Sequence, residues 1–400
     1  MPSHTSRNNN TISSGVRKRG LSPILICTAV VCFLASTIPL TTAAVNKAEF
    51  PVGSAVPPTN HPRVLQWLAE IDLKGAPEIA LNKGEPPDCP AKFTPGVCYW
   101  TCEDCANDDV VECPDKNVWG LTFDDGPTPD TPDLLDFLDQ QQVKATFFLI
   151  GANVVQRPEM VMRVATAGHH LASHTWSHHA LTTLTNEQIV AEIKWTEKAI
   201  LDATGLRVRY MRPPYGDVDN RVRFVLKKLG YTVVDWGGDT FDSNDWKIPS
   251  LSPSAVVSHL EKAITTYASH AANITKGFIT LEHDLTSETI SVAKSLIPFG
   301  KRQNLQIMSV ADCLHDTSPY GVAVNVAVTS PPINTLPPPA PVPATATAGN
   351  QTAQGSGVTN LKSDGLDLAA SHSGSAAAAS VWSSGIVLGS FAVAAGLALL

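Results

Sequence analysis

The chain has 400 residues, a formal net charge of -8 and a hydrophobic fraction of 43%. A chain of this length and composition has room for one large folded domain with additional segments. Its acidic balance offers no basic surface of the kind that binds nucleic acid, so we expect no nucleic-acid partner.

Residues 1–44 are predicted to be a secretory signal peptide. Basic residues at 17–19 precede the uncharged run 21–42, and Thr42-Ala43-Ala44 at its end is a small-residue pattern typical of a cleavage site. A single-pass anchor is the alternative, because the run is nearly long enough to span a membrane. Export makes the acceptor sequons at Asn273 and Asn350 usable for N-glycosylation.

The other end of the sequence has the layout of a GPI-attachment signal. Residues 375–400 end in an apolar run that begins at Gly385, and Ser373, Gly374 and Ser375 are candidate attachment residues. Residues 316–374 are rich in Pro, Ser, Thr and Ala, a composition that buries no core and predicts a disordered stalk. We therefore expect a protein held at the cell surface, in the plasma membrane or the cell wall, by a lipid anchor.

Residues 45–116 form a Cys-rich N-terminal extension. Of the eight cysteines, two lie in the signal peptide, and the remaining six are Cys89, Cys98, Cys102, Cys105, Cys113 and Cys313. An even number in an exported protein predicts three disulfides. The Cys102-x-x-Cys105 spacing is also compatible with a zinc knuckle or a redox pair. Cys313 lies far from the others and is expected to tie the end of the domain to its beginning.

Residues 117–315 alternate between strand-like and helix-like stretches. The predicted strands are 118–123, 145–150, 170–174, 208–212, 231–236, 277–281 and 305–310, and predicted helices include 132–141, 187–204, 221–229 and 253–268. Repeated strand–helix units imply an α/β fold with a parallel sheet, and their number favours a closed or nearly closed barrel. No Gly-x-Gly-x-x-Gly follows a strand, so a dinucleotide-binding fold has no support.

Candidate site residues follow the ends of these strands, where barrels of this kind place their chemistry. The first strand ends in Asp124-Asp125, and two adjacent carboxylates at a buried strand end need a positive partner, with a metal ion as the first candidate. Turn or helix-cap chemistry is the alternative. His174 and His178 are four residues apart, so one helical turn would place both imidazoles on the same side. Two histidines and one carboxylate would give three metal ligands with an open position for water.

Three later strand ends add polar and aromatic residues. Arg212 precedes a rigid Pro-Pro turn, where its charge can hold a carboxylate ionised. Asp245 stands next to Trp246, and Leu281 is followed by His283. Each has a structural alternative: a surface ion pair, a packed aromatic side chain or a hydrogen-bonded histidine. Their occurrence at successive strand ends favours a single catalytic site.

Five motifs carry a resemblance to a known family. They are Thr122-Phe-Asp-Asp-Gly-Pro, His174-Thr-x-Ser-His178, Arg212-Pro-Pro-Tyr215, Asp242-x-x-Asp245-Trp246 and Leu281-x-His283. In this order they resemble the motifs of the polysaccharide deacetylases of carbohydrate esterase family 4, the NodB-homology domain, over about residues 118–310. The exported, anchored layout is similar to that of fungal chitin deacetylases. The resemblance implies a distorted (β/α) barrel and metal-assisted removal of acetyl groups from N-acetylglucosamine units, turning chitin into chitosan in cell-wall remodelling.

The same resemblance implies a metal centre and a base. Asp125, His174 and His178 would hold the metal, zinc or alternatively cobalt, which acidifies water and polarises the acetamide carbonyl. Asp124, kept ionised by Arg212, would take the proton from that water.

It also implies roles for the residues around the acetyl group. The backbone N–H of Tyr215 would meet the oxyanion, and His283, oriented by Asp245, would protonate the departing amine. Trp246 and Leu281 would enclose the acetyl methyl. Two alternatives stay open: a catalytically silent chitin-binding protein of the cell wall, and a deacetylase of another polymer such as acetylxylan or peptidoglycan.

Overall fold

The computed structural model describes residues 45–89, 95–270 and 273–321. The predicted signal peptide, Asn350, the GPI-attachment residues 373–375 and the predicted stalk from residue 322 onward lie outside the described residues. Within the described ranges, no helix is both long enough and apolar enough to cross a membrane.

Eight of the described strands form two parallel sheets, and the other two form a short antiparallel pair. The five-stranded sheet has the order β2 (Thr122–Asp124), β3 (Thr146–Leu149), β4 (His170–Ser173), β6 (Tyr210–Met211) and β7 (Thr232–Val233). In the three-stranded sheet, β1 (Val118–Gly120) lies between β8 (Phe278–Ile279) and β9 (Gln306–Met308). Both sheets are parallel, as the alternation of strands and helices predicted.

Backbone contacts between the named strands connect the two sheets. The N–H of Gly237, shortly after β7, donates to the carbonyl oxygen of Ile279 at the end of β8 (3.0 Å). Further along the same segment a parallel bridge pairs His283 with Asp124 at the end of β2. Backbone hydrogen bonds and bridges therefore connect β2 through β7 to the segment after β8 and return to β2, which supports the expected distorted barrel.

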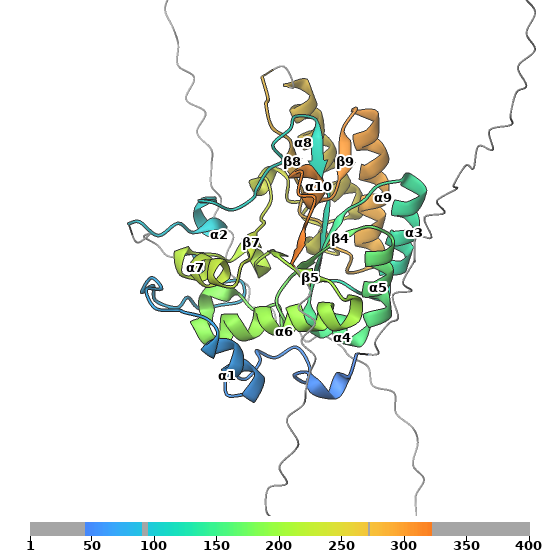
Figure 1. Cartoon of the computed structure of the whole chain (residues 1–400). Helices are drawn as coiled ribbons and strands as arrows, with labels where there is room; N and C mark the ends of the chain where they lie inside the picture. The colour runs from blue at the N-terminus through green and yellow to red at the C-terminus, as the bar shows by residue number, and fades with distance from the viewer. Residues whose placement is uncertain (1–44, 90–94, 271–272, 322–400) are drawn as a thin grey trace, which may run out of the picture. The chain divides into compact units, whose positions relative to one another are not determined.

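Helices surround these strands (Figure 1). Their bounds are α3 (Thr131–Gln141), α4 (Gly151–Gln156), α5 (Pro158–Thr166), α6 (Asn186–Thr204), α7 (Asn220–Lys228), α8 (Pro253–Ser269), α9 (Ser287–Arg302) and α10 (Val310–Cys313). The four helices named from the sequence correspond to α3, α6, α7 and α8. Helix α6 begins with a reciprocal capping box between Thr185 and Gln188 and ends at Gly205 with φ of 75°.

The core lies between the strands and their covering helices. Trp119, Phe123, Phe147 and Trp195 are fully buried there. Their burial supplies the main favourable free energy of folding and leaves the polar strand ends to form the site.

The N-terminal extension packs against the barrel instead of standing apart from it. It contains α1 (Pro62–Ala69) and α2 (Trp100–Glu103). Phe50 stacks on Trp176 with ring centroids 5.9 Å apart, and Trp67 meets Trp195 of α6 edge-on at 5.1 Å. These contacts bury aromatic surface on both sides, so the extension and the barrel form one continuous core.

The three predicted disulfides are present. Cys89 pairs with Cys102 and Cys98 with Cys105 inside the extension, while Cys113 pairs with Cys313. The last bond ties the end of the domain to its beginning, as expected. Since both residues of the Cys102-x-x-Cys105 pair are bonded elsewhere, a zinc knuckle at that pair is excluded.

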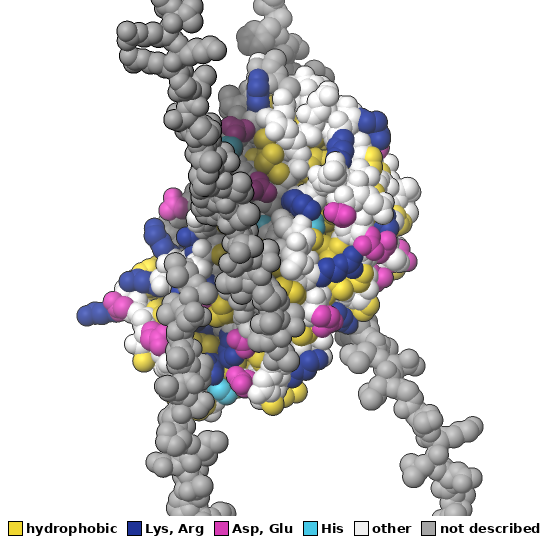
Figure 2. Space-filling model, turned by 45° about the vertical axis from the view of Figure 1, so that its right-hand side comes forward, with side chains coloured by type: hydrophobic (Ala, Val, Ile, Leu, Met, Phe, Trp, Pro, Cys, Tyr) yellow, Lys and Arg dark blue, Asp and Glu magenta, His cyan; other side chains and the backbone are white. Residues whose placement is uncertain are grey.

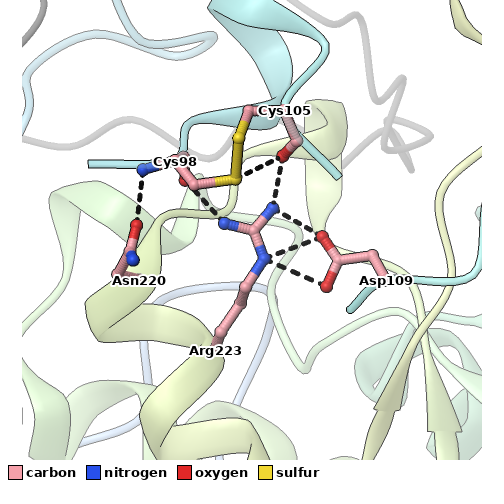
Figure 3. The surroundings of a disulfide bond; sticks show 5 residues. All are labelled: Cys98, Cys105, Asp109, Asn220 and Arg223. Atoms are coloured by element: carbon pink, nitrogen blue, oxygen red, sulfur yellow. Dashed lines mark hydrogen bonds and ion pairs between the residues drawn. A yellow bond between two sulfur atoms is a disulfide. The ribbon is translucent and has the colours of Figure 1, made fainter. Parts of the chain in front are cut away.

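Arg223 of α7 attaches the second disulfide loop to the barrel (Figure 3). Its guanidinium donates to the backbone carbonyl oxygens of Cys98 (2.6 Å) and Cys105 (2.8 Å) and to the carboxylate of Asp109 (2.5 to 3.0 Å). Asn220, at the start of α7, accepts the backbone N–H of Cys98 (2.5 Å). One side chain thus holds three points of the extension.

The folded part extends beyond the predicted boundary at residue 315. β10 (Tyr320–Gly321) pairs antiparallel with β5 (Arg207–Val208), and Asp316 accepts the hydroxyl of Tyr210 (2.7 Å). Residues 316–321 therefore belong to the domain and not to the stalk. Their short, polar composition gives no sign of this, because the pairing partner lies about a hundred residues earlier.

Charged side chains of both signs are interspersed with small groups of hydrophobic side chains on the face drawn in Figure 2.

Candidate functional site

The predicted site residues meet in one cavity of about 400 Å³. The lining includes eight of them: Asp124, Asp125, His174, His178, Tyr215, Trp246, Leu281 and His283. Arg212 and Asp245 are buried and do not line the cavity. Arg212 hydrogen-bonds to Asp124, and Asp245 hydrogen-bonds to His283. Asn273 is exposed in the turn after α8 and is not part of the lining.

Three of the lining residues form a cluster that can hold a metal ion. Their candidate ligand atoms all lie within 4.8 Å of one another. Oδ1 of Asp125 is 3.5 Å from Nε2 of His174 and 3.3 Å from Nε2 of His178. This oxygen is buried and, within the described part of the chain, has no hydrogen-bond partner. Because buried polar atoms are almost always paired, an orphaned carboxylate oxygen facing two imidazoles fits a divalent cation.

The protonation states of the cluster also suit a cation. Nδ1 of His174 is 2.8 Å from the carbonyl oxygen of Arg212, which directs Nε2 toward Asp125. Burial lowers the pKa of His174 to about 3 and also lowers the pKa of His178, so both imidazoles are neutral. Burial acts to raise the pKa of Asp125, but the histidines around it, of which His283 is the protonated one, outweigh this effect and the net pKa is lowered. Neutral imidazoles and a carboxylate are the forms that bind metal.

The expectation that a helical turn joins the two histidines is wrong. Residues 174–179 form no helix, and both Thr175 (φ 66°) and His178 (φ 61°) adopt the left-handed region. The hydroxyl of Thr175 accepts the N–H of His178 (3.1 Å), which closes a tight loop. A four-residue spacing brings two side chains together in such a loop as well as in a helix.

Glu192 of α6 holds this loop from the inside. Its Oε2 accepts the backbone N–H groups of Trp176 (2.7 Å) and Ser177 (2.9 Å), and its Oε1 accepts the hydroxyl of Ser177 (2.5 Å). The next histidine in the chain, His179, directs its Nδ1 to the Ser177 hydroxyl (2.8 Å). It is not one of the three residues that could hold a metal ion. Glu192 belongs to no motif, and the only sign of it in the sequence is an acid on the buried side of an amphipathic helix.

Asp124 and Arg212 form the expected ion pair. Nη1 of Arg212 donates to Oδ1 of Asp124 (2.9 Å) and to the hydroxyl of Thr122 (2.7 Å), and the guanidinium is fully buried over the ring of Phe148. Burial raises the pKa of Asp124 to about 6, although Arg212 acts in the opposite direction. The carboxyl is therefore a base above about pH 6, a range suited to accepting a proton near neutrality.

His283 lines the cavity and is hydrogen-bonded to Asp245, which is buried beside it. Nδ1 of His283 is 2.6 Å from Oδ1 of Asp245, and the backbone N–H of His283 donates to Oδ2 (2.9 Å). Burial acts to lower the pKa of His283, but Asp245 raises it, and the net pKa is about 10. Asp245 belongs to the short helix η5 (Asp245–Lys247). The pair thus presents a protonated imidazole to the cavity.

Two large aromatic side chains stand at the exposed part of the lining. Trp246 is 51% exposed and Tyr215 is 37% exposed, whereas most aromatic residues of the domain are buried. Tyr215 lies in η3 (Pro214–Gly216) with φ of 61°. Pro86, Thr101, Pro213, Trp236 and Asp242 complete the lining. Pro86 and Thr101 lie in the extension and outside every motif, so no pattern in the sequence marks them as site residues.

Comparison with known proteins agrees with this geometry. Residues 111–234 match the profile of the polysaccharide deacetylase family. Chitin deacetylase 1 of Cryptococcus neoformans var. grubii is 43% identical over 292 residues, which cover 70% of this chain and 62% of the relative. Chitin deacetylase 1 of Saccharomyces cerevisiae is 38% identical over 252 residues, covering 62% of this chain and 77% of the relative.

Among solved structures, the chitin deacetylase of Colletotrichum lindemuthianum is 29% identical with a TM-score of 0.48 and covers 53% of this chain and 95% of that one. The chain spans less than two thirds of the Cryptococcus relative but more than three quarters of the yeast one. With these relatives and the matching profile, the chain belongs to the polysaccharide deacetylase family.

Proposed function

We propose that this protein is a metal-dependent deacetylase that hydrolyses the N-acetyl groups of N-acetylglucosamine units in chitin and gives chitosan and acetate. The observation that carries the proposal is the meeting of three parts in one cavity. These are the Asp125–His174–His178 cluster, the Asp124–Arg212 ion pair and the His283–Asp245 pair. Amide hydrolysis needs an activated water, a base and an acid for the leaving amine, and the cavity contains a group for each.

We propose zinc as the ion held by the cluster, with cobalt as the alternative, because two imidazoles and one carboxylate leave an open position in a tetrahedral site. When bound, such an ion supplies Lewis-acid chemistry that acidifies water and polarises the acetamide carbonyl. Asp124 accepts the proton of the attacking water, and Arg212 keeps its carboxylate in place. The N–H of Tyr215 donates to the developing oxyanion.

The leaving group is the amine of the sugar, which departs readily only when it is protonated. His283 donates that proton, and Asp245 holds the imidazole in orientation through two hydrogen bonds. Leu281 offers an apolar surface to the acetyl methyl, while the exposed rings of Trp246 and Tyr215 suit contact with sugar rings.

The three disulfides indicate an oxidising compartment and hence the secretory route. We propose the cell surface as the destination and a GPI anchor as the attachment, on the sequence features of residues 373–400 alone.

Acetate release from chitin oligomers tests the activity. We expect the purified full-length protein to release acetate, to lose activity when a chelator removes the metal and to regain it on addition of zinc or cobalt. Acetylxylan serves as the comparison substrate. Release from acetylxylan but not from chitin oligomers would transfer the activity to that polymer, and release from neither would leave a binding role.

A further inference from the structure

The cavity is not lined by barrel residues alone. Pro86 and Thr101 come from the N-terminal extension, and both lie outside residues 111–234, which match the family profile. Pro86 lies in the turn of residues 84–87, where Gly84 and Pro87 form an antiparallel bridge, and Thr101 lies in α2. We refer to this turn and α2 together as the extension wall.

A hydrogen bond and a disulfide fix the extension wall next to the loop that carries His174 and His178. The carboxylate of Glu85 accepts the backbone N–H of Ala180 (2.8 Å), two residues after His178. The Cys89–Cys102 disulfide joins the chain just after the turn to α2. The turn therefore has covalent and polar attachment to the rest of the site, although Glu85 and Pro86 themselves are exposed.

The extension wall also contacts the loop that carries Tyr215. The hydroxyl of Thr101 donates to the carbonyl oxygen of Tyr215 (3.1 Å). The backbone N–H of Trp100 donates to the carbonyl oxygen of Val218 (3.2 Å). A Cβ on Gly216 would lie 2.5 Å from the Trp100 ring, so only glycine permits this close approach. The extension and the loop that carries Tyr215 are therefore closely packed against each other.

We propose that the extension wall is a specificity-determining part of the cleft, which contacts the sugar units next to the one that loses its acetyl group. This inference rests on the proposed deacetylase function. The reacting acetamide occupies the part of the cavity between Asp124, His283 and the metal cluster, and the cavity of about 400 Å³ is larger than that group. A polymer bound in it extends past Pro86, whose apolar ring can pack against a sugar ring.

Length-dependent kinetics of the full-length protein test the proposal. Pro86→Ala removes the ring from the wall, and Glu85→Ala removes the bond to Ala180, whereas Glu85→Gln keeps an acceptor. Leu81→Ala is the matched control, because Leu81 is an exposed residue of the same extension that does not line the cavity. The substrates are a chitin pentamer and 4-nitrophenyl acetate, a small ester without a sugar.

We expect Pro86→Ala and Glu85→Ala to raise KM for the pentamer about three- to tenfold, the effect of roughly 1 kcal/mol of lost contact. Both variants should keep the pentamer kcat and the rate on the ester, while Glu85→Gln and the control match the wild type. Calorimetric Kd values for the pentamer should rise by the same factor. Thermal unfolding midpoints close to the wild-type value show that the variants are folded, and Pro86→Ser is a second test of the ring.

Unchanged KM and Kd in the wall variants would overturn the proposal. Equal losses on the pentamer and the ester would also overturn it, because the wall would then act on the catalytic centre. If the wild type binds the pentamer but releases no acetate, the deacetylase function fails, and the Kd series still tests the wall.

Discussion

Several residues of the site hold backbone conformations that are unfavourable for their type. Asp125, Thr175, His178 and Tyr215 all have φ between 61° and 77°, the left-handed region that favours glycine. Such residues cost on the order of 1 to 3 kcal/mol each and persist only when their surroundings enforce them. Here the enforcing contacts are hydrogen bonds such as the one from the His178 N–H to the Thr175 hydroxyl. Contacts within the fold therefore hold the backbone of the site in these conformations.

A residue-scale prediction concerns Asp245. Burial acts to lower the pKa of His283 and Asp245 raises it, so Asp245→Asn should lower that pKa from its wild-type value of about 10. The proton-donating form is then lost at a lower pH. We expect a reduced kcat on chitin oligomers and an alkaline limb of the pH–rate profile that begins at lower pH than in the wild type.

An ester substrate provides the control for this prediction. An alcohol leaving group needs less protonation than an amine, so Asp245→Asn and His283→Ala should lose much less rate on an acetyl ester than on chitin oligomers. Equal losses on both substrates would show that the pair maintains the shape of the site and does not deliver the proton.

At the scale of elements, helix α6 packs in the core and also contacts the loop that carries His174 and His178. One face packs against the aromatic residues of the extension. Glu192 on this helix accepts the backbone N–H groups of Trp176 and Ser177, which lie between His174 and His178. A buried carboxylate that accepts three hydrogen bonds orients a loop far more firmly than packing alone. We infer that Glu192 is a positioning residue.

Glu192→Ala should weaken zinc binding by about ten- to a hundredfold, the usual effect of removing an outer-shell partner of a metal site. Glu192→Gln, which retains acceptor and donor groups of the same shape, should recover most of the affinity. Glu187→Ala, an exposed acid on the same helix, is the control. Competition with a chromophoric chelator measures the affinities, and equal values for Glu192→Ala and the control would contradict the positioning role.

Most elements could be predicted because the strands are apolar runs, several of which end in a recognisable motif. The His174–His178 loop could not, since its shape depends on Glu192, a partner in a later helix, and the four-residue spacing is compatible with a helix or a loop. Residues 316–321 were missed for a similar reason, because their strand pairs with Arg207 and Val208. Pro86 and Thr101 carry no motif, and only the folded extension brings them to the cavity.

At the scale of the whole molecule, the Cys113–Cys313 disulfide closes the domain. It joins residues 200 positions apart, next to β1 and within α10. Closing so long a loop restricts the unfolded chain strongly, and loss of a native disulfide typically costs about 2 to 5 kcal/mol. The double variant Cys113→Ser/Cys313→Ser should therefore unfold at a clearly lower temperature.

The corresponding double variant at Cys98 and Cys105 is the comparison, because that bond closes a loop of only 7 residues. Its loss should lower the unfolding midpoint less. A larger decrease for the short loop would mean that the extension, and not the closure of the barrel, dominates the stability of the domain.

The central claim is that the two adjacent aspartates have different roles, Asp125 as a metal ligand and Asp124 as the base. The most direct measurement is metal content together with acetate release for the matched variants Asp124→Asn and Asp125→Asn, both purified at full length. We expect Asp124→Asn to retain about one zinc per chain and to lose turnover, and Asp125→Asn to lose both metal and turnover. Stoichiometric zinc in Asp125→Asn, or substantial acetate release by Asp124→Asn, would contradict the account.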